Sequence, residues 1–137
     1  MSDPSPALQP GRTYPRRILA ADDDPVVREF LKLYLAVEGT QVDVVDDGGP
    51  AIARLGEDFD LLVLDLDMPG KDGFDVLRAL AASPPARPLP VVVLTSRTDA
   101  AAIADAFELG ASAYVLKPIS RATLTAKVST VYMAARL

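Results

Sequence analysis

Acidic side chains follow two short apolar runs of this sequence. Asp22 and Asp23 come directly after the run at residues 18–21, and Asp65 comes directly after the run at residues 61–64. Three carboxylates held close together would repel one another unless a cation lay between them. Such a group is suited to binding a hard divalent cation, and one of its carboxylates could attack a phosphoryl group as a nucleophile.

Two later apolar runs end in groups that could neutralise phosphoryl oxygens. Thr95 follows the run at residues 91–94, and Lys117 follows the run at residues 114–116. Phosphoryl transfer depends mainly on in-line positioning and on neutralisation of the equatorial oxygens. A bound cation, the Lys117 ammonium and the Thr95 hydroxyl would together provide that neutralisation.

The residue types that are missing restrict the kind of metal. The 137 residues include no cysteine and no histidine, so disulfides, thiolate ligands and imidazole ligands are excluded. Any metal must therefore be bound through oxygen. Mg²⁺ fits because it takes one or two carboxylates and leaves positions for phosphate oxygens. Mn²⁺ could substitute for it, whereas Zn²⁺ should be disfavoured.

Length, charge and hydropathy exclude other classes of protein. The chain has room for one domain, and 50% of its residues are hydrophobic, which is enough for a continuous core. The net charge of −5 argues against nucleic acid as a direct partner, because phosphate backbones bind clustered Lys and Arg. No apolar run reaches the roughly 18–20 residues of a membrane span, and residues 1–15 lack the apolar region expected of a signal peptide. These features predict a cytoplasmic protein with no membrane partner.

The elements that must position these side chains alternate regularly. Strands are predicted at 18–21, 40–45, 61–64, 91–94 and 114–116, and a helical pattern follows each of them. The third and fourth strands are apolar on both faces, as central strands of a parallel sheet require. Alternation of this kind predicts a doubly wound α/β fold with helices on both faces. Ligands bind at the carboxyl ends of such strands, which is where the site residues lie.

The ends of the helices can also be predicted. Asp24 and Pro25 have the residue types of a helix N-cap and first position, and Gly39 would end that helix. Its apolar face would comprise Val27, Phe30, Leu31, Tyr34 and Leu35. A short second helix is predicted from Gly49 to Gly56. The proline-rich residues 1–15 are predicted to form a disordered leader before a domain at 16–137.

Four motifs resemble one known family in both order and spacing. They are ILAADDDP at 18–25, LDLDMPGKDG at 64–73, LTS at 94–96 and YVLKP at 114–118. They resemble the CheY-like receiver domain of response regulators, which belong to bacterial two-component systems and phosphorelays. The resemblance covers residue 16 to about residue 137. It implies a flavodoxin-like, doubly wound, five-stranded parallel sheet of order 2-1-3-4-5 with five helices.

The resemblance also implies roles for individual residues. Asp65 would be the phosphoacceptor, charged by a histidine kinase or a phosphotransfer protein. Lys117 would contact the phosphoryl group and pair with Asp65 at rest, and its peptide bond to Pro118 would be cis. Thr95 would assist catalysis. Mg²⁺ would be held by Asp22, Asp23, Asp65 and the backbone carbonyl of Asp67.

A switch is part of the same implication. Thr95 would move to bond a phosphoryl oxygen, and Tyr114 would turn inward behind it. The surface formed by the fourth helix, fifth strand and fifth helix (residues 99–137) would then bind an unknown output partner or a second copy of the chain. From their positions alone, each two residues after a site residue, Asp67 and Arg97 could form an ion pair over the cleft and tune the phosphoryl lifetime. The protein would be a signalling switch that catalyses only its own phosphoryl transfer and autodephosphorylation.

Two other interpretations remain open. The LDLD motif also resembles the nucleophile motif of haloacid-dehalogenase-type phosphatases, but in those enzymes an acidic pair follows the lysine, whereas here Asp22 and Asp23 precede Asp65. The second alternative is a receiver that serves only as a docking surface and never takes phosphate; the intact set of site residues argues against it. No output-domain pattern follows the last helix, so we expect a stand-alone regulator or a fragment of a longer protein.

Overall fold

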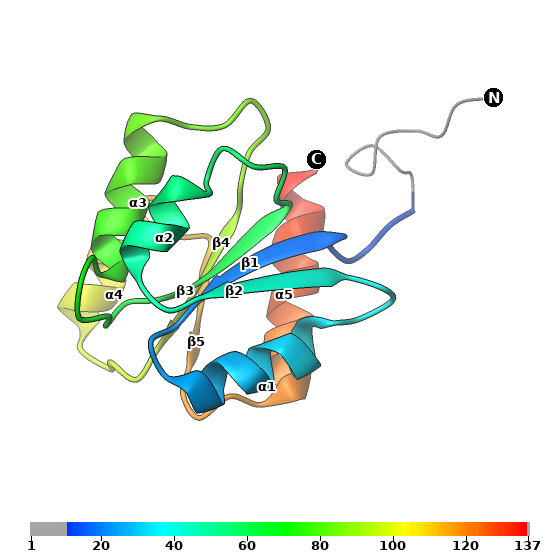
Figure 1. Ribbon diagram of the computed structural model, residues 1–137, viewed down its shortest axis with the longest axis horizontal. Coiled ribbons are helices and arrows are strands. Elements are labelled where there is room, and N and C mark those ends of the chain that lie inside the picture. Colours follow the sequence, from blue (N-terminus) through cyan, green and yellow to red (C-terminus); the bar gives the residue numbers. More distant parts are fainter. Residues whose placement is uncertain (1–10, 137) are drawn as a thin grey trace.

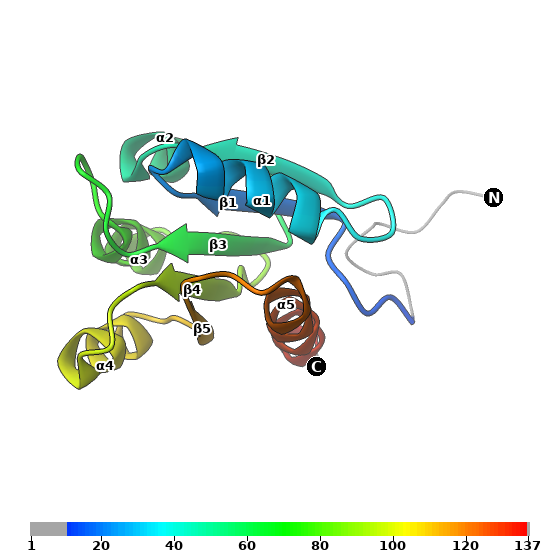
Figure 2. The ribbon, with the colours of Figure 1, turned by 90° about the horizontal axis from the view of Figure 1, so that it is seen from below.

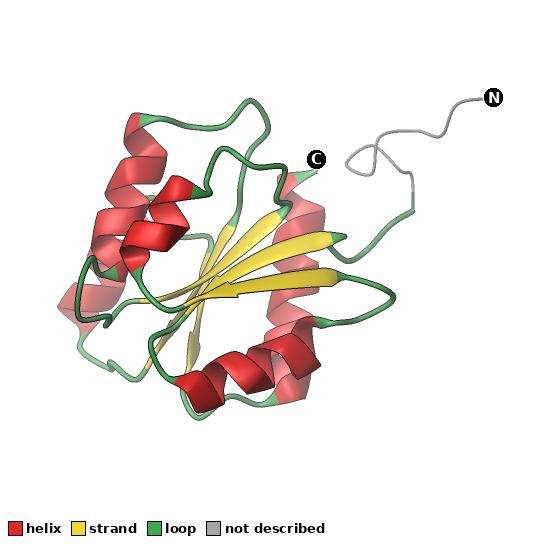
Figure 3. Cartoon of the chain, in the orientation of Figure 1, coloured by secondary structure: helices red, strands yellow, loops and turns green. Residues whose placement is uncertain are grey.

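The computed structural model describes residues 11–136. In this part of the chain five strands alternate with five helices and form one parallel sheet of order β2-β1-β3-β4-β5 (Figures 1 and 3). The predicted fold is therefore confirmed. The strands are β1 (Arg17–Ala21), β2 (Gln41–Val45), β3 (Leu61–Asp65), β4 (Val91–Thr95) and β5 (Ala113–Leu116). The helices are α1 (Pro25–Leu35), α2 (Gly48–Ala53), α3 (Gly73–Ala82), α4 (Ala100–Glu108) and α5 (Arg121–Ala135).

The sheet separates two hydrophobic layers. Helices α1 and α5 cover one face, and α2, α3 and α4 cover the other (Figure 2). Successive strand residues point to opposite faces, so Ile18 packs with α1 and α5 while Leu19 packs with α2 and α3. Every residue of β3 and β4 is buried, as their two-faced apolar pattern predicts. None of the helices described is long and apolar enough to cross a bilayer.

Helix α1 begins as predicted but ends earlier. The Asp24 side chain accepts a hydrogen bond from Val26 N–H at 2.9 Å, which satisfies a free donor of the first turn. The helix ends at Leu35 and not at Gly39. Val37 N–H donates to the Leu35 carbonyl, and Thr40 N–H then donates to the Val37 carbonyl. Gly39 lies in this second turn with a φ of 79°, where a left-handed backbone favours glycine.

Two further boundaries differ from the prediction. Helix α2 covers Gly48–Ala53. It begins one residue before the predicted start at Gly49, because Asp47 provides the N-cap, and it ends before Gly56. Phe30 was expected on the buried face of α1, but 43% of it is exposed. Its ring stacks on Tyr34 at the edge of the helix with centroids 5.6 Å apart.

The packed part of the chain starts before the predicted boundary at residue 16. Tyr14 is only 5% exposed and belongs to the core beneath α5. Ser129 of α5 donates a hydrogen bond to the Thr13 carbonyl at 2.7 Å, and Thr40 Oγ1 donates to the Pro15 carbonyl at 2.7 Å. Residues 1–10 of the predicted leader lie outside the described residues.

Candidate functional site

The site residues converge at the carboxyl edge of the sheet. Ala21 pairs with Leu64, so the residues that follow them, Asp22 and Asp65, lie side by side at the ends of β1 and β3. Thr95 ends β4, and Lys117 follows β5 directly. Strand order reverses between β1 and β3, which is the place where doubly wound sheets bind ligands. The four side chains therefore lie at the carboxyl edge of the sheet, as the sequence predicted.

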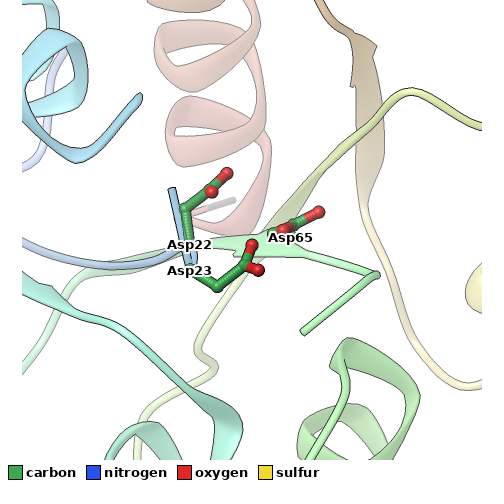
Figure 4. Close-up of side chains that lie close together, drawn as sticks. All are labelled: Asp22, Asp23 and Asp65. Carbon is green, nitrogen blue, oxygen red and sulfur yellow. The ribbon is translucent and has the colours of Figure 1, made fainter. Parts of the chain in front are cut away.

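Three carboxyl groups form a cluster there. One oxygen each from Asp22, Asp23 and Asp65 lies within 4.8 Å of the other two. Figure 4 shows their carboxyl groups turned toward a common space. Asp22 and Asp65 are buried, whereas Asp23 is exposed and leaves that space open to solvent. The arrangement suits a cation that keeps some of its water.

Asp22 is held by contacts on nearly every polar atom. Its N–H donates to the Val45 carbonyl at 3.1 Å, and its Oδ1 accepts from Asp24 N–H at 2.9 Å. Its carbonyl accepts from Arg28 Nη1 at 2.8 Å. Arg28 was missed in the sequence because nothing distinguishes it from other basic residues of a helix. We infer that Arg28 fixes the turn from which Asp22 and Asp23 project.

The second carboxylate oxygen of Asp22 is buried and faces Lys117. Lys117 Nζ lies 2.9 Å from Oδ2, so this oxygen is paired with an ammonium. One ammonium does not balance the charge of three clustered carboxylates. A divalent cation in the cluster would supply the missing positive charge to oxygen ligands, so the residues present fit Mg²⁺.

Asp65 is electrostatically strained in the absence of a cation. Burial raises the pKa of its carboxyl to about 7, the Asp22 charge adds to the rise, and Lys117 opposes it. Its Oδ1 accepts a hydrogen bond from Asp67 N–H at 3.2 Å, which favours the ionised form. A cation beside Asp65 would therefore help to keep its carboxylate ionised and nucleophilic.

Lys117 lies between two carboxylates. Its Nζ is 2.9 Å from Asp22 Oδ2 and 3.6 Å from Asp65 Oδ2. The expected resting pair with Asp65 is thus the longer of the two contacts, because β1 lies beside β3 and brings Asp22 within reach. Burial by itself lowers the pKa of Lys117, but the two carboxylates outweigh burial and raise it. The peptide bond to Pro118 is cis, as the resemblance implied.

Thr95 and Arg97 form the rim on the β4 side. Thr95 is fully buried, and its Oγ1 accepts a hydrogen bond from Arg97 N–H at 2.9 Å. The Arg97 guanidinium binds the Asp67 carboxylate, with Nη2 and Oδ1 2.7 Å apart. The expected ion pair is therefore present. Because both side chains are about half exposed, the pair stabilises the fold by at most about 1 kcal/mol.

Tyr114 lies on β5 opposite Val93 of β4. It is half-buried, and its ring meets Phe107 of α4 edge-on with centroids 5.9 Å apart. Both rings line a groove of 520 Å³ between α4, β5 and α5, together with Leu116 and Lys127. Tyr114, which is expected to turn inward when Thr95 moves, thus lies at the surface that is expected to bind a partner.

The structure separates Asp23 from its neighbour Asp24, and this distinction can be tested. Asp23 joins the carboxylate cluster, whereas Asp24 caps α1. We expect Asp23→Ala to weaken Mg²⁺ binding at least tenfold by calorimetric titration, and Asp24→Ala to lower the free energy of unfolding by about 1 kcal/mol with little change in Mg²⁺ affinity. Equal losses of affinity would mean that the metal pair has been misplaced by one residue.

Comparison with known proteins agrees with this geometry. The family described as response regulator receiver domain matches residues 18–129. The DNA-binding response regulator MtrA of Mycolicibacterium smegmatis is 40% identical over 117 residues, which are 85% of this chain and 50% of that protein. The transcriptional regulatory protein ResD of Bacillus subtilis is 36% identical over 110 residues, which are 80% of this chain and 45% of that protein. The chain thus spans about half the length of these relatives.

A solved structure supports the fold independently. The CheY-like receiver domain protein from Methanospirillum hungatei JF-1 superposes with a TM-score of 0.79, covering 88% of this chain and 95% of that one. Its sequence identity is 24%, so this likeness concerns the fold alone.

Proposed function

This chain belongs to the family of response regulator receiver domains, and we propose that it is a signalling switch that is phosphorylated on Asp65. The observation that carries the proposal is the environment of that residue. Asp65 is buried at the carboxyl edge of the sheet, with two other aspartates in its cluster and Lys117 Nζ at 3.6 Å. A carboxylate in such a place is suited to covalent phosphoryl transfer, which depends on positioning and on neutralisation of charge.

The phosphoryl group would come from a phosphohistidine of a histidine kinase or a phosphotransfer protein. One Asp65 oxygen attacks phosphorus, an O–P bond forms and the donor's N–P bond breaks. The imidazole leaves with the electron pair and takes up a proton from water. Lys117 is placed to neutralise a phosphoryl oxygen, and the Thr95 hydroxyl can donate to another once it turns toward the site.

The same cluster would hold the cation. Asp22, Asp23, Asp65 and the backbone carbonyl of Asp67 would bind Mg²⁺, with Mn²⁺ as a substitute. When bound, Mg²⁺ neutralises charge on the phosphoryl oxygens and relieves the repulsion among the carboxylates. Asp22 contributes here in a second way, because its contact with Lys117 keeps that ammonium directed into the site.

Loss of the signal would follow from hydrolysis. A water molecule attacks the phosphorus of the acyl phosphate, the Asp65 carboxylate is restored, and inorganic phosphate leaves. The Asp67–Arg97 ion pair spans the β3 and β4 sides of the site. We propose that this pair limits the approach of water and so sets the lifetime of the phosphorylated form.

A downstream partner would recognise the phosphorylated state by binding to the surface of α4, β5 and α5. This partner would be another protein or a second copy of this chain, bound at the groove that contains Tyr114 and Phe107. For these residues themselves we propose a protein and not DNA, because the net charge is −5. The DNA binding in the name of the MtrA relative concerns a protein of which this chain covers 50%. On the basis of its family we place the switch in the cytoplasm.

Acetyl phosphate provides the direct test. With Mg²⁺ present, intact-mass spectrometry should show one added phosphoryl group, because the small donor needs only the nucleophile and the neutralising groups of this chain. Addition of EDTA before the donor should reduce the adduct to background. Labelling that is equally strong with EDTA would contradict a metal-assisted site, and no labelling under either condition would favour a receiver that serves only as a docking surface.

A further inference from the structure

The loop between β3 and α3 (residues 66–72) rests against the amino end of α2. Gly48, the first residue of α2, donates its N–H to the Lys71 carbonyl at 3.0 Å. A Cβ atom on Gly48 would overlap that same carbonyl oxygen, so the two backbones approach this closely only because residue 48 has no side chain. The loop includes Asp67, whose carbonyl belongs to the proposed cation site.

A second glycine makes a related contact from the loop side, against a side chain. Gly70 lies against the carboxylate of Asp47, and a Cβ atom on Gly70 would overlap it. Asp47 is the N-cap of α2, and its Oδ1 accepts the Gly48 N–H at 2.6 Å. The cap of α2 and the loop therefore pack directly on each other through Gly48 and Gly70.

The rest of the loop has little freedom to move away. Gly73 donates its N–H to the Leu66 carbonyl at 3.0 Å, which closes the loop at its base. Leu66 and Met68 are buried in the core on the α2 and α3 side. Because the loop is tethered at both ends, it cannot relieve a clash at Lys71 or Gly70 by moving away as a whole. The clash would instead distort the backbone between the tethers, which includes Asp67.

We propose that Gly48 and Gly70 are positioning residues of the cation site. By letting the amino end of α2 press against residues 66–72, they set the place of the Asp67 carbonyl relative to the three carboxylates. Neither glycine touches the cation or the phosphoryl group. This inference rests on the proposed function, because it takes the Asp67 carbonyl to be a metal ligand.

Gly49 offers a matched control. It follows Gly48 in the same helix, yet a Cβ atom on it would meet nothing within 4 Å. Substitution by alanine removes the same backbone freedom at both positions, so it should stabilise the fold at Gly49 by about 0.5–1 kcal/mol. Only the substitution at Gly48 disturbs the contact with Lys71. If these glycines served only to start the helix, the two variants would bind Mg²⁺ with equal affinity.

The experiment is a calorimetric titration with Mg²⁺ alone, at a temperature where circular dichroism shows each variant to be folded. Displaced outer contacts of a metal site lower affinity by about 10–100-fold, so we expect at least tenfold weaker binding in Gly48→Ala. Gly49→Ala should bind as the wild type does, within about twofold. Equal dissociation constants for Gly48→Ala and Gly49→Ala would overturn the inference.

Gly70 keeps the test decisive if Gly48→Ala does not fold. Gly70→Ala should also weaken Mg²⁺ binding, although less than Gly48→Ala does, because the new methyl group meets the end of a side chain and not a backbone carbonyl. The double variant Gly70→Ala/Asp47→Gly should recover most of the loss, because it removes that carboxylate. Absence of recovery would contradict positioning through this contact. Asp23→Ala distinguishes failure of the proposed cation site from failure of the positioning role. If the wild type binds no Mg²⁺, or if Asp23→Ala binds it equally well, the proposed function fails and this inference fails with it.

Discussion

Asp65→Asn is expected to abolish phosphoryl transfer from acetyl phosphate while leaving the fold intact. The amide has almost the same shape as the carboxylate but is not a nucleophile at neutral pH. The adduct seen by intact-mass spectrometry should fall to background. Asp58→Asn is the matched control, because the Asp58 side chain is 77% exposed and pairs with Arg87 at the opposite edge of the sheet. A full adduct in Asp65→Asn would contradict the assignment of the phosphoacceptor.

The same substitution should stabilise the metal-free protein at neutral pH. Burial raises the pKa of Asp65 to about 7 in the folded chain, whereas an unfolded chain has a value of about 3.9. The folded state therefore holds the proton more tightly, so its stability falls as pH rises from about 4 to 7. Relative to wild type, Asp65→Asn should gain on the order of 4 kcal/mol at pH 8, or roughly 10–15 °C in Tm.

Thermal unfolding across pH checks this result. The difference in Tm between Asp65→Asn and wild type in EDTA should be small near pH 4 and should level off above pH 7. Saturating Mg²⁺ should remove much of the difference at pH 8 by raising the Tm of the wild type, because the cation binds the folded state and neutralises the cluster. A difference independent of pH would show that Asp65 titrates normally.

The sheet and the acidic site were predictable because their signals are local and redundant. Two-faced apolar runs identify β3 and β4, and alternation with helices then leaves a doubly wound sheet. Once the fold is known, topology alone brings Asp22, Asp65, Thr95 and Lys117 to one edge. The conclusion follows without any distance, because the carboxyl ends of parallel strands all lie at the same edge of the sheet.

The details that were missed depend on contacts between segments distant in the sequence. Lys117 lies closer to Asp22 than to Asp65 because of side-chain reach across two strands, which no spacing encodes. In the sequence nothing distinguishes Gly48 from other glycines at the start of a helix, and its close contact with the Lys71 carbonyl appears only in the structure. The end of α1 at Leu35 is set by a hydrogen-bonded turn before Gly39, so the glycine marked the turn and not the last helical residue.

Thr95→Ala is expected to disconnect the site from the surface of α4, β5 and α5. A phosphoryl group adds about −1.5 to −2 charges beside Asp65. Thr95 is fully buried, and its Oγ1 accepts the Arg97 N–H. We expect the side chain to turn toward the phosphoryl oxygen, which would disturb this hydrogen bond and alter the β4 edge beside β5. Thr95 pairs with Leu116, two residues along β5 from Tyr114. Tyr114 in turn contacts Phe107 of α4.

Amide hydrogen exchange with and without beryllofluoride, a mimic of the phosphoryl group, measures this coupling. In wild type, protection of α4 and of Tyr114 should change by about tenfold, the middle of the range for coupled sites. The change should shrink to the vicinity of Asp65 in Thr95→Ala and persist in Thr95→Ser, which keeps the hydroxyl. If α4 responds equally in Thr95→Ala, the signal travels by another route, and the assignment of Asp65 stands regardless. Phosphorylation can shift a two-state surface only through contacts that differ between the two states. An equal response in Thr95→Ala would therefore mean that the Thr95 hydroxyl makes no such contact.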